Sequence, residues 1–194
     1  PGTMIADDYE SFLFDLDGVL YRGAAPVPHA AASLARLRSL AKPVAFVTNN
    51  SGHTQEQVAG RLRSVGIDAD ASEVETSALT TARVLAERGV RRAFVVGEDG
   101  IRHALAAAGV IVVDADADEA DAVVVGWDRR VDYTALRVAS VLVQRGASLV
   151  ATNPDASFPA ADGTRWPGAG ALLAAIETTT GVRGDVIGKP SPPL

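Results

Sequence analysis

Short apolar runs alternate with segments of helical periodicity along the whole chain, and this alternation restricts the fold more than any other feature. A strand followed by a helix and another strand forms a parallel pair with a crossover helix. We predict strands at 11–16, 43–47, 92–96, 110–113, 122–125, 148–152 and 185–187, and helices at 29–40, 54–65, 76–88, 100–108, 133–144 and 170–177. The pattern therefore indicates an α/β fold built on parallel sheets.

Composition excludes several other classes of protein. The chain has 194 residues, 47% of them hydrophobic, a formal net charge of -6 and no cysteine. It is long enough for one large domain or two modest ones. Disulfides and cysteine-bound zinc are excluded, and the acidic balance argues against a nucleic-acid partner. No apolar run approaches the roughly 20 residues of a membrane-spanning helix, so we expect no membrane partner and a cytoplasmic location.

Two carboxylates follow the first apolar run. Asp15 and Asp17 lie two residues apart and precede Gly18. Ligands of open parallel sheets bind at such strand ends, and paired carboxylates can divide nucleophilic attack from proton transfer. Their charge also favours a hard cation such as Mg²⁺. Taken alone, the same residues are equally typical of an ordinary turn.

Two further strand ends carry polar side chains. Thr48, Asn49 and Asn50 follow the second predicted strand, where hydroxyl and amide groups can hold phosphoryl oxygens. Lys189 follows the last predicted strand and can neutralise a cluster of carboxylate and phosphate. Each segment alone could be a polar loop, but the three together are more specific.

The three segments together resemble the haloacid dehalogenase-like (HAD) phosphatases. The stretches 151–155, 167–170 and 188–192 also resemble the branch that holds p-nitrophenyl phosphate, pyridoxal phosphate, phosphoglycolate and glycerol 3-phosphate phosphatases, most of all the actinobacterial glycerol 3-phosphate enzymes. This resemblance implies a Rossmann-like parallel-sheet core with an inserted α/β cap. It also implies an Mg²⁺-dependent phosphatase that acts on a small phosphorylated metabolite.

The resemblance assigns roles to individual residues. Asp15 would be the nucleophile that forms an aspartyl-phosphate, and Asp17 the general acid and then base. Mg²⁺ would be held by the Asp15 carboxylate and the Asp17 backbone carbonyl. Thr48 and Asn49 would bind the phosphoryl group, and Lys189 would stabilise both Asp15 and the transferred phosphate. The expected substrate-binding residues are Gly18, Asn49, Asn50, Asn153, Asp155 and Phe158.

The resemblance also implies a division into domains. We expect the first part of the core at 1–88, the cap at 89–184 and the start of the core's return segment at 185–194. A cap closes over the site and excludes water. We expect the irregular stretch 153–168 to supply its substrate contacts, since long loops in compact domains are usually functional.

One departure from the family pattern leaves two functions open. The fourth family motif, an acidic pair that completes the Mg²⁺ site, has no counterpart in the five residues after Lys189, and 191–194 has the composition of a helix start. We therefore expect the C-terminal part of the core to be missing from this chain. The alternative is a catalytically incomplete module that binds a phosphate ligand. The third acidic metal ligand stays unidentified, and a homodimer stays open.

Overall fold

The computed structural model describes residues 5–160 and 163–194, which form two compact units. The first unit, here unit 1, contains the described residues up to Thr48 together with Gln55–Glu75. The second, unit 2, contains Asn49–Thr54 and Thr76–Leu194. The chain therefore passes between the units three times, and the short segment Asn49–Thr54 belongs to unit 2 although unit 1 flanks it on both sides.

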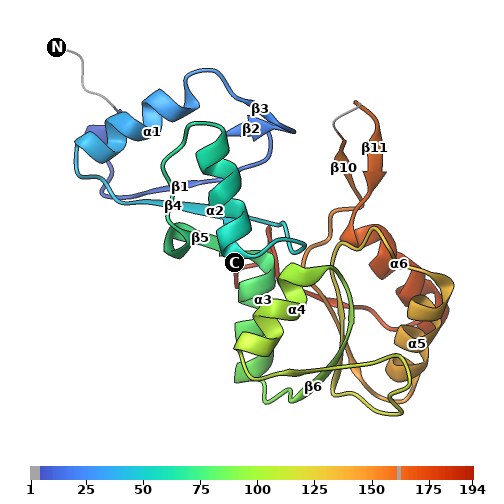
Figure 1. Ribbon diagram of the computed structural model, residues 1–194. Helices are drawn as coiled ribbons and strands as arrows, with labels where there is room; N and C mark the ends of the chain where they lie inside the picture. The colour runs from blue at the N-terminus through green and yellow to red at the C-terminus, as the bar shows by residue number, and fades with distance from the viewer. Residues whose placement is uncertain (1–4, 161–162) are drawn as a thin grey trace. The chain divides into compact units, whose positions relative to one another are not determined.

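Unit 1 is built on a small sheet with strand order β1-β4-β5 (Figure 1). Its strands are β1 (Phe12–Phe14), β4 (Val44–Thr48) and β5 (Val74–Thr76), and β1 pairs with β4 in parallel. Its other elements are η1 (Ile5–Asp7), the hairpin of β2 (Tyr21–Arg22) and β3 (Ala25–Pro26), α1 (Ala30–Ser39), α2 (Gln55–Ser64) and η2 (Ala71–Glu73). Leu16, Phe46 and Leu62 are fully buried in its core.

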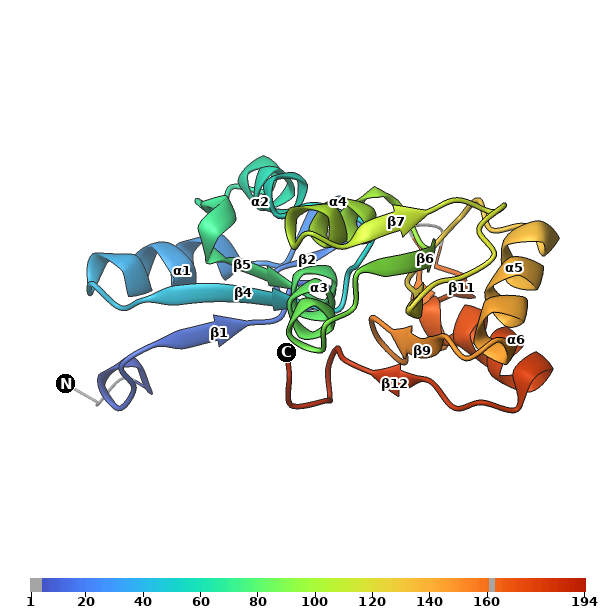
Figure 2. The ribbon, with the colours of Figure 1, turned by 90° about the horizontal axis from the view of Figure 1, so that it is seen from below.

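Unit 2 is built on a five-stranded parallel sheet with strand order β12-β9-β8-β6-β7. The strands are β6 (Arg92–Val96), β7 (Ile111–Val113), β8 (Ala122–Val125), β9 (Ser148–Ala151) and β12 (Asp185–Val186). Helices α3 (Ser77–Glu87) and α4 (Asp99–Ala107) lie on one side of it, and α5 (Tyr133–Gln144) and α6 (Ala169–Thr180) on the other (Figures 1 and 2).

The two faces of this sheet are set by the alternation of side chains along each strand. Val95, Val124 and Val150 pack toward α3 and α4, whereas Val96 and Val125 pack toward α5 and α6. Because helices cover both faces, the strands are apolar throughout, as in other buried parallel sheets. Full burial of one such side chain contributes about 1.5–3 kcal/mol. The sheet is therefore a rigid base for the loops at its carboxyl edge.

The structure confirms the α/β class, the parallel pairing and all of the predicted helices, but some details were wrong. The stretch 153–168, expected to be irregular, contains a hairpin of β10 (Ser157–Pro159) and β11 (Arg165–Pro167), in which Phe158 pairs with Trp166. Helix α6 continues to Thr180 and ends at Gly181, whose φ of 72° suits only glycine well. Residues 191–194 form turns, not the expected helix start. The short strands β2, β3 and β5 were not predicted from the sequence, because turn-forming residues alone do not reveal them.

The predicted domain boundaries stay a prediction. Helix α3, which we assigned to the core, lies in unit 2 with the elements that follow it. Among residues 5–160 and 163–194, no helix combines the length and the apolar character needed to cross a bilayer.

Candidate active site

The carboxylate pair lies in unit 1, directly after β1. Asp15 and Asp17 are exposed, and Leu16 between them is fully buried. Gly18 has a φ of 87°, and its N–H donates to the carbonyl of Tyr21 over 2.8 Å. The turn therefore needs glycine at position 18, and it keeps both carboxylates in solvent while Leu16 fixes the backbone in the core.

Tyr21 and Arg61 lie beside this pair and were missed from the sequence. The Tyr21 side chain is buried, and burial, with the nearby Asp17 charge, raises the pKa of its hydroxyl well above the usual value despite the opposing effect of Arg61. The Arg61 guanidinium lies 4.4 Å from the centre of the Tyr21 ring and donates to the carbonyl of Gly23 over 2.8 Å. A cation is thus fixed near the two carboxylates. Nothing in the spacing of the chain marks this pair.

Thr48 is the last residue of β4 and is buried in unit 1. Asn49 and Asn50, the next two residues, belong to unit 2, as do Asn153, Asp155, Phe158 and Lys189. The predicted site residues thus fall into two groups, with Asp15, Asp17, Gly18 and Thr48 in unit 1. The structure brings most members of the second group into one network.

Asn49 is at the centre of that network. Its Nδ2 donates to the carbonyl of Lys189 and to Oδ2 of Asp155, both over 3.1 Å, and its Oδ1 accepts the Lys189 N–H over 2.8 Å. Its own carbonyl accepts from Ser77 Oγ over 2.7 Å and from Asn153 Nδ2 over 2.8 Å. Three of the sequence segments, those around 49, 153 and 189, therefore meet at the carboxyl edge of the unit 2 sheet.

Asn153 and Asp155 are held by the beginning of α6. The buried Asn153 accepts the Asp155 N–H on its Oδ1 over 3.1 Å. The Asp155 carbonyl accepts the N–H of Gly170 over 3.0 Å, and a side chain at either Gly168 or Gly170 would collide with backbone oxygens of this loop. The two glycines are therefore required by close packing. The Asn153 side chain holds the loop, and its expected substrate contact stays a prediction.

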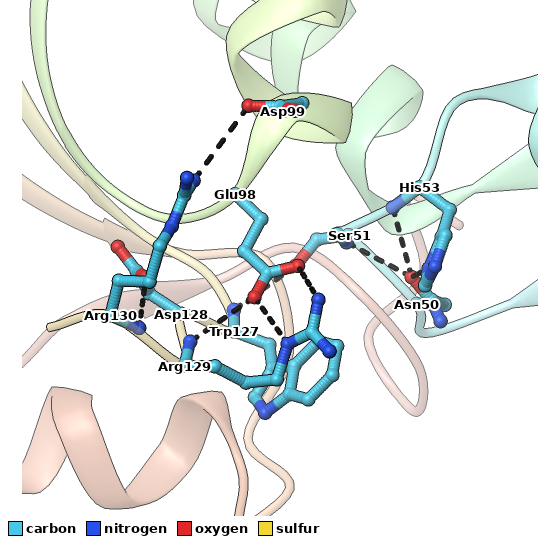
Figure 3. A network of polar contacts seen from close by, with 10 residues as sticks. Asn50, Ser51, His53, Glu98, Asp99, Trp127, Asp128, Arg129 and Arg130 are labelled. Atoms are coloured by element: carbon cyan, nitrogen blue, oxygen red, sulfur yellow. Dashed lines mark hydrogen bonds and ion pairs between the residues drawn. The ribbon is translucent and has the colours of Figure 1, made fainter.

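The loop that follows Asn49 is fixed to the residues after β8 and β9 (Figure 3). Ser51 Oγ accepts from Thr152 Oγ1 over 3.0 Å and from the N–H of Trp127 over 3.3 Å. A Cβ on Gly126 would lie 2.8 Å from Ser51 Oγ, so glycine is needed there. Asn50 Oδ1 accepts the N–H groups of Gly52 and His53. The side chain of Asn50 thus shapes the loop, and its substrate contact stays a prediction.

An ion pair between a buried carboxylate and an exposed guanidinium lies next to the same loop. Glu98 is almost completely buried, and its carboxylate accepts from Arg129 Nε over 2.7 Å and from Nη2 over 3.2 Å. Burial opposes the charge on Glu98, but hydrogen bonds from the Arg129 side chain and backbone outweigh it, so the pKa of Glu98 lies below its usual value. Arg129 also lies over the Trp127 ring, at 4.9 Å from its centre. Sequence reasoning missed this pair. The repeated Val-Val-Gly segments before Glu98 and Trp127 were the available signal, because their glycines mark strand ends that the side chains of Ile101 and Ser51 approach closely.

Phe158 is part of an aromatic series on the same unit. Its ring meets Trp127 edge to face with centres 5.0 Å apart, and it meets Trp166 at 6.3 Å. The hairpin of β10 and β11 thus presents a partly exposed apolar surface next to the loop of Asp155. Such a surface suits the non-reacting part of a small organic substrate.

The donor set for a metal ion is incomplete among the described residues. No group of three or more His, Cys, Asp or Glu side chains there is arranged to hold a metal. Asp15 and Asp17 nevertheless supply hard oxygen donors, the type that Mg²⁺ prefers, and Mg²⁺ commonly needs only one or two protein carboxylates with water and phosphate oxygens.

Asp15, Asp17 and Thr48 follow strands of the unit 1 sheet, and Lys189 follows β12 of the unit 2 sheet. Carboxylate, hydroxyl and lysine groups at strand ends are side chains of the kinds that α/β phosphoryl-transfer hydrolases use. Residues 12–111 match the model of the haloacid dehalogenase-like hydrolases, and the chain belongs to this family. Its relatives are HAD-type phosphatases.

Three relatives illustrate the similarity. An acid sugar phosphatase of Staphylococcus saprophyticus is 40% identical over 187 residues, covering 95% of this chain and 71% of the relative. The magnesium complex of the glycerol phosphate phosphatase Rv1692 from Mycobacterium tuberculosis superposes with a TM-score of 0.92 at 35% identity, covering 99% of this chain and 58% of that one. A single-mutant thermostable NPPase of Geobacillus stearothermophilus gives 0.86 at 39% identity, with 95% and 72% covered.

Proposed function

We propose that this chain carries the catalytic residues of an Mg²⁺-dependent phosphatase of small phosphate monoesters, with glycerol 3-phosphate or a similar polyol or sugar phosphate as substrate. The observation that carries the proposal is the exposed Asp15 and Asp17 pair, held at the end of β1 by the buried Leu16 and the turn at Gly18. The acid sugar phosphatase and the glycerol phosphate phosphatase support the substrate class.

In this proposal Asp15 attacks phosphorus and forms an aspartyl-phosphate while the substrate alcohol leaves. Asp17 gives its proton to the leaving oxygen and then takes a proton from the water that hydrolyses the intermediate, which returns Asp15 to its free form. The exposed position of Asp17 lets substrate and water reach its carboxylate.

Phosphoryl transfer depends mainly on positioning and on neutralising charge. We assign the Thr48 hydroxyl, the Asn49 main-chain N–H and the Lys189 ammonium to the phosphoryl oxygens. The Asn49 side chain is not assigned to them, because both of its amide hydrogens are already engaged. Mg²⁺, held by Asp15 and the Asp17 carbonyl, would neutralise further phosphate charge.

The remainder of the substrate is assigned to unit 2. Asp155 offers a carboxylate that accepts hydrogen bonds from sugar or glycerol hydroxyls, and the Phe158 ring offers an apolar edge. Neither group favours a nucleic acid, whose phosphates need clustered positive charge.

A panel of phosphate esters tests the proposal. We expect phosphate release from glycerol 3-phosphate or from sugar phosphates in the presence of Mg²⁺, weaker release from pyridoxal phosphate, and none after chelation with EDTA. Phosphate esters that bind without being hydrolysed, with or without Mg²⁺, would instead support a module that only binds its ligand.

A further inference from the structure

The side chain of Asn49 forms two hydrogen bonds with the main chain of a single residue, Lys189. Its Oδ1 accepts the Lys189 N–H over 2.8 Å, and its Nδ2 donates to the Lys189 carbonyl over 3.1 Å. The second amide hydrogen is directed to Oδ2 of Asp155, 3.1 Å away. The Asn49 amide thus forms with the Lys189 main chain the two hydrogen bonds that a neighbouring strand would form. Lys189 itself lies beyond the end of β12.

Asn49 is itself fixed from two other elements. Its carbonyl accepts from Ser77 at the start of α3 and from Asn153 after β9, over 2.7 and 2.8 Å. Asn153 is buried and is fixed in turn by the Asp155 N–H. The amide that holds Lys189 is therefore attached to a rigid frame and does not move independently of the sheet.

Gly188 shows how closely the two segments approach. A Cβ at this position would collide with the Thr152 carbonyl and would lie 2.8 Å from Asn49 Oδ1. The N–H of the preceding Ile187 donates to the Ala151 carbonyl over 3.0 Å, so the chain enters this contact in a fixed register. The glycine before Lys189 is thus required by the Asn49 contact as well as by the strand.

We infer that the Asn49 side chain positions Lys189, and that this side chain acts on the reaction through the Lys189 main chain, whereas only the Asn49 main-chain N–H is assigned to the phosphoryl group. This inference rests on the proposed function, because it takes Lys189 as the cation of the phosphoryl site. A lysine on a flexible stem reaches one point reliably only if its backbone is fixed, and a displacement of about 1 Å at a catalytic group can lower the rate by about a hundredfold.

The test compares Asn49→Ala with the matched control Asp121→Ala. Asp121 also holds backbone by its side chain, accepting the N–H groups of Arg91 and Arg92 over 2.8 and 2.9 Å, but it does so before β8, at the opposite edge of the same sheet. Two quantities are measured in each protein: the hydrogen-exchange rate of the Lys189 main-chain N–H, and kcat and KM for the best substrate of the ester panel.

We expect Asn49→Ala to speed exchange of the Lys189 N–H by at least about tenfold, because that N–H loses its acceptor. We expect kcat to fall by about ten- to a hundredfold, with a smaller change in KM. Asp121→Ala should change neither quantity by more than about twofold, since surface contacts at distant sites act independently.

The double variant Asn49→Asp with Asp155→Asn keeps the assay informative if Asn49→Ala fails to fold. It retains an acceptor for the Lys189 N–H and a donor between positions 155 and 49, but it replaces the donor to the Lys189 carbonyl by an oxygen. Exchange of the Lys189 N–H should therefore be slower than in Asn49→Ala and faster than in the wild type. Exchange in Asn49→Ala as slow as in the wild type, or unchanged kcat, would overturn the inference. A wild-type protein that hydrolyses no ester would overturn the proposed function instead, and the exchange rates would still decide whether Asn49 holds Lys189.

Discussion

Glu98 shows how a single charged residue can hold a loop near the candidate site. Its carboxylate is buried beneath the Gly52 loop, and Arg129 supplies three hydrogen bonds to it, one from the backbone and two from the side chain. A buried carboxylate is stable in its charged form only with such partners. The position of Arg129, which follows β8, therefore depends on the ionised form of Glu98.

This dependence predicts a specific effect of pH. The pKa of Glu98 is lower in the folded chain than its ordinary value of 4.5, so its contribution to stability is present above that value and is lost as the pH falls through the folded pKa. We expect Glu98→Gln to lower the free energy of unfolding at about pH 6 and to cost much less at about pH 3. Urea unfolding at both values measures this. The difference should disappear when Arg129→Gln is already present, and an equal cost at both pH values would contradict the assignment.

At the scale of elements, the sequence was informative wherever a strand or helix had its own periodicity. The apolar runs 92–96 and 122–125 and the helical stretch 133–144 were predicted with the bounds that the structure has. The hairpin of β10 and β11 was not predicted, because a strand of three residues is too short to show a recognisable alternation. The pairing of the two strands depends on Phe158 and Trp166, which face each other across the turn. Contacts such as Asn49 with Lys189 join residues 140 positions apart, so no local pattern reveals them.

Two helical glycines make the role of close packing testable. Gly60 in α2 has room for a methyl group, since the nearest atom to its Cβ would be Arg63 Nη2 at 3.7 Å. Gly100 in α4 has none, because its Cβ would lie 2.6 Å from backbone atoms of Ser51 and His53. We expect Gly60→Ala to stabilise by about 0.5–1 kcal/mol and Gly100→Ala to destabilise by about 1–3 kcal/mol, measured as shifts of the urea midpoint. Equal shifts in the same direction would show that helix propensity, not packing, decides both.

At the scale of the whole molecule, the candidate catalytic groups are divided between two compact units. Unit 1 carries Asp15, Asp17 and Thr48, and unit 2 carries Asn49 and Lys189. Thr48 and Asn49 are consecutive in the chain, so the passage between the units occurs within the second polar motif.

The measurement that tests the central claim most directly is phosphate release by Asp15→Asn in the presence of Mg²⁺. An amide matches the carboxylate in size but cannot attack phosphorus, so we expect turnover to fall to background. Circular dichroism and the urea midpoint should match the wild type, because Asp15 is exposed. A correctly folded Asp15→Asn protein that releases phosphate at close to the wild-type rate would contradict the account, since its nucleophile would then lie elsewhere.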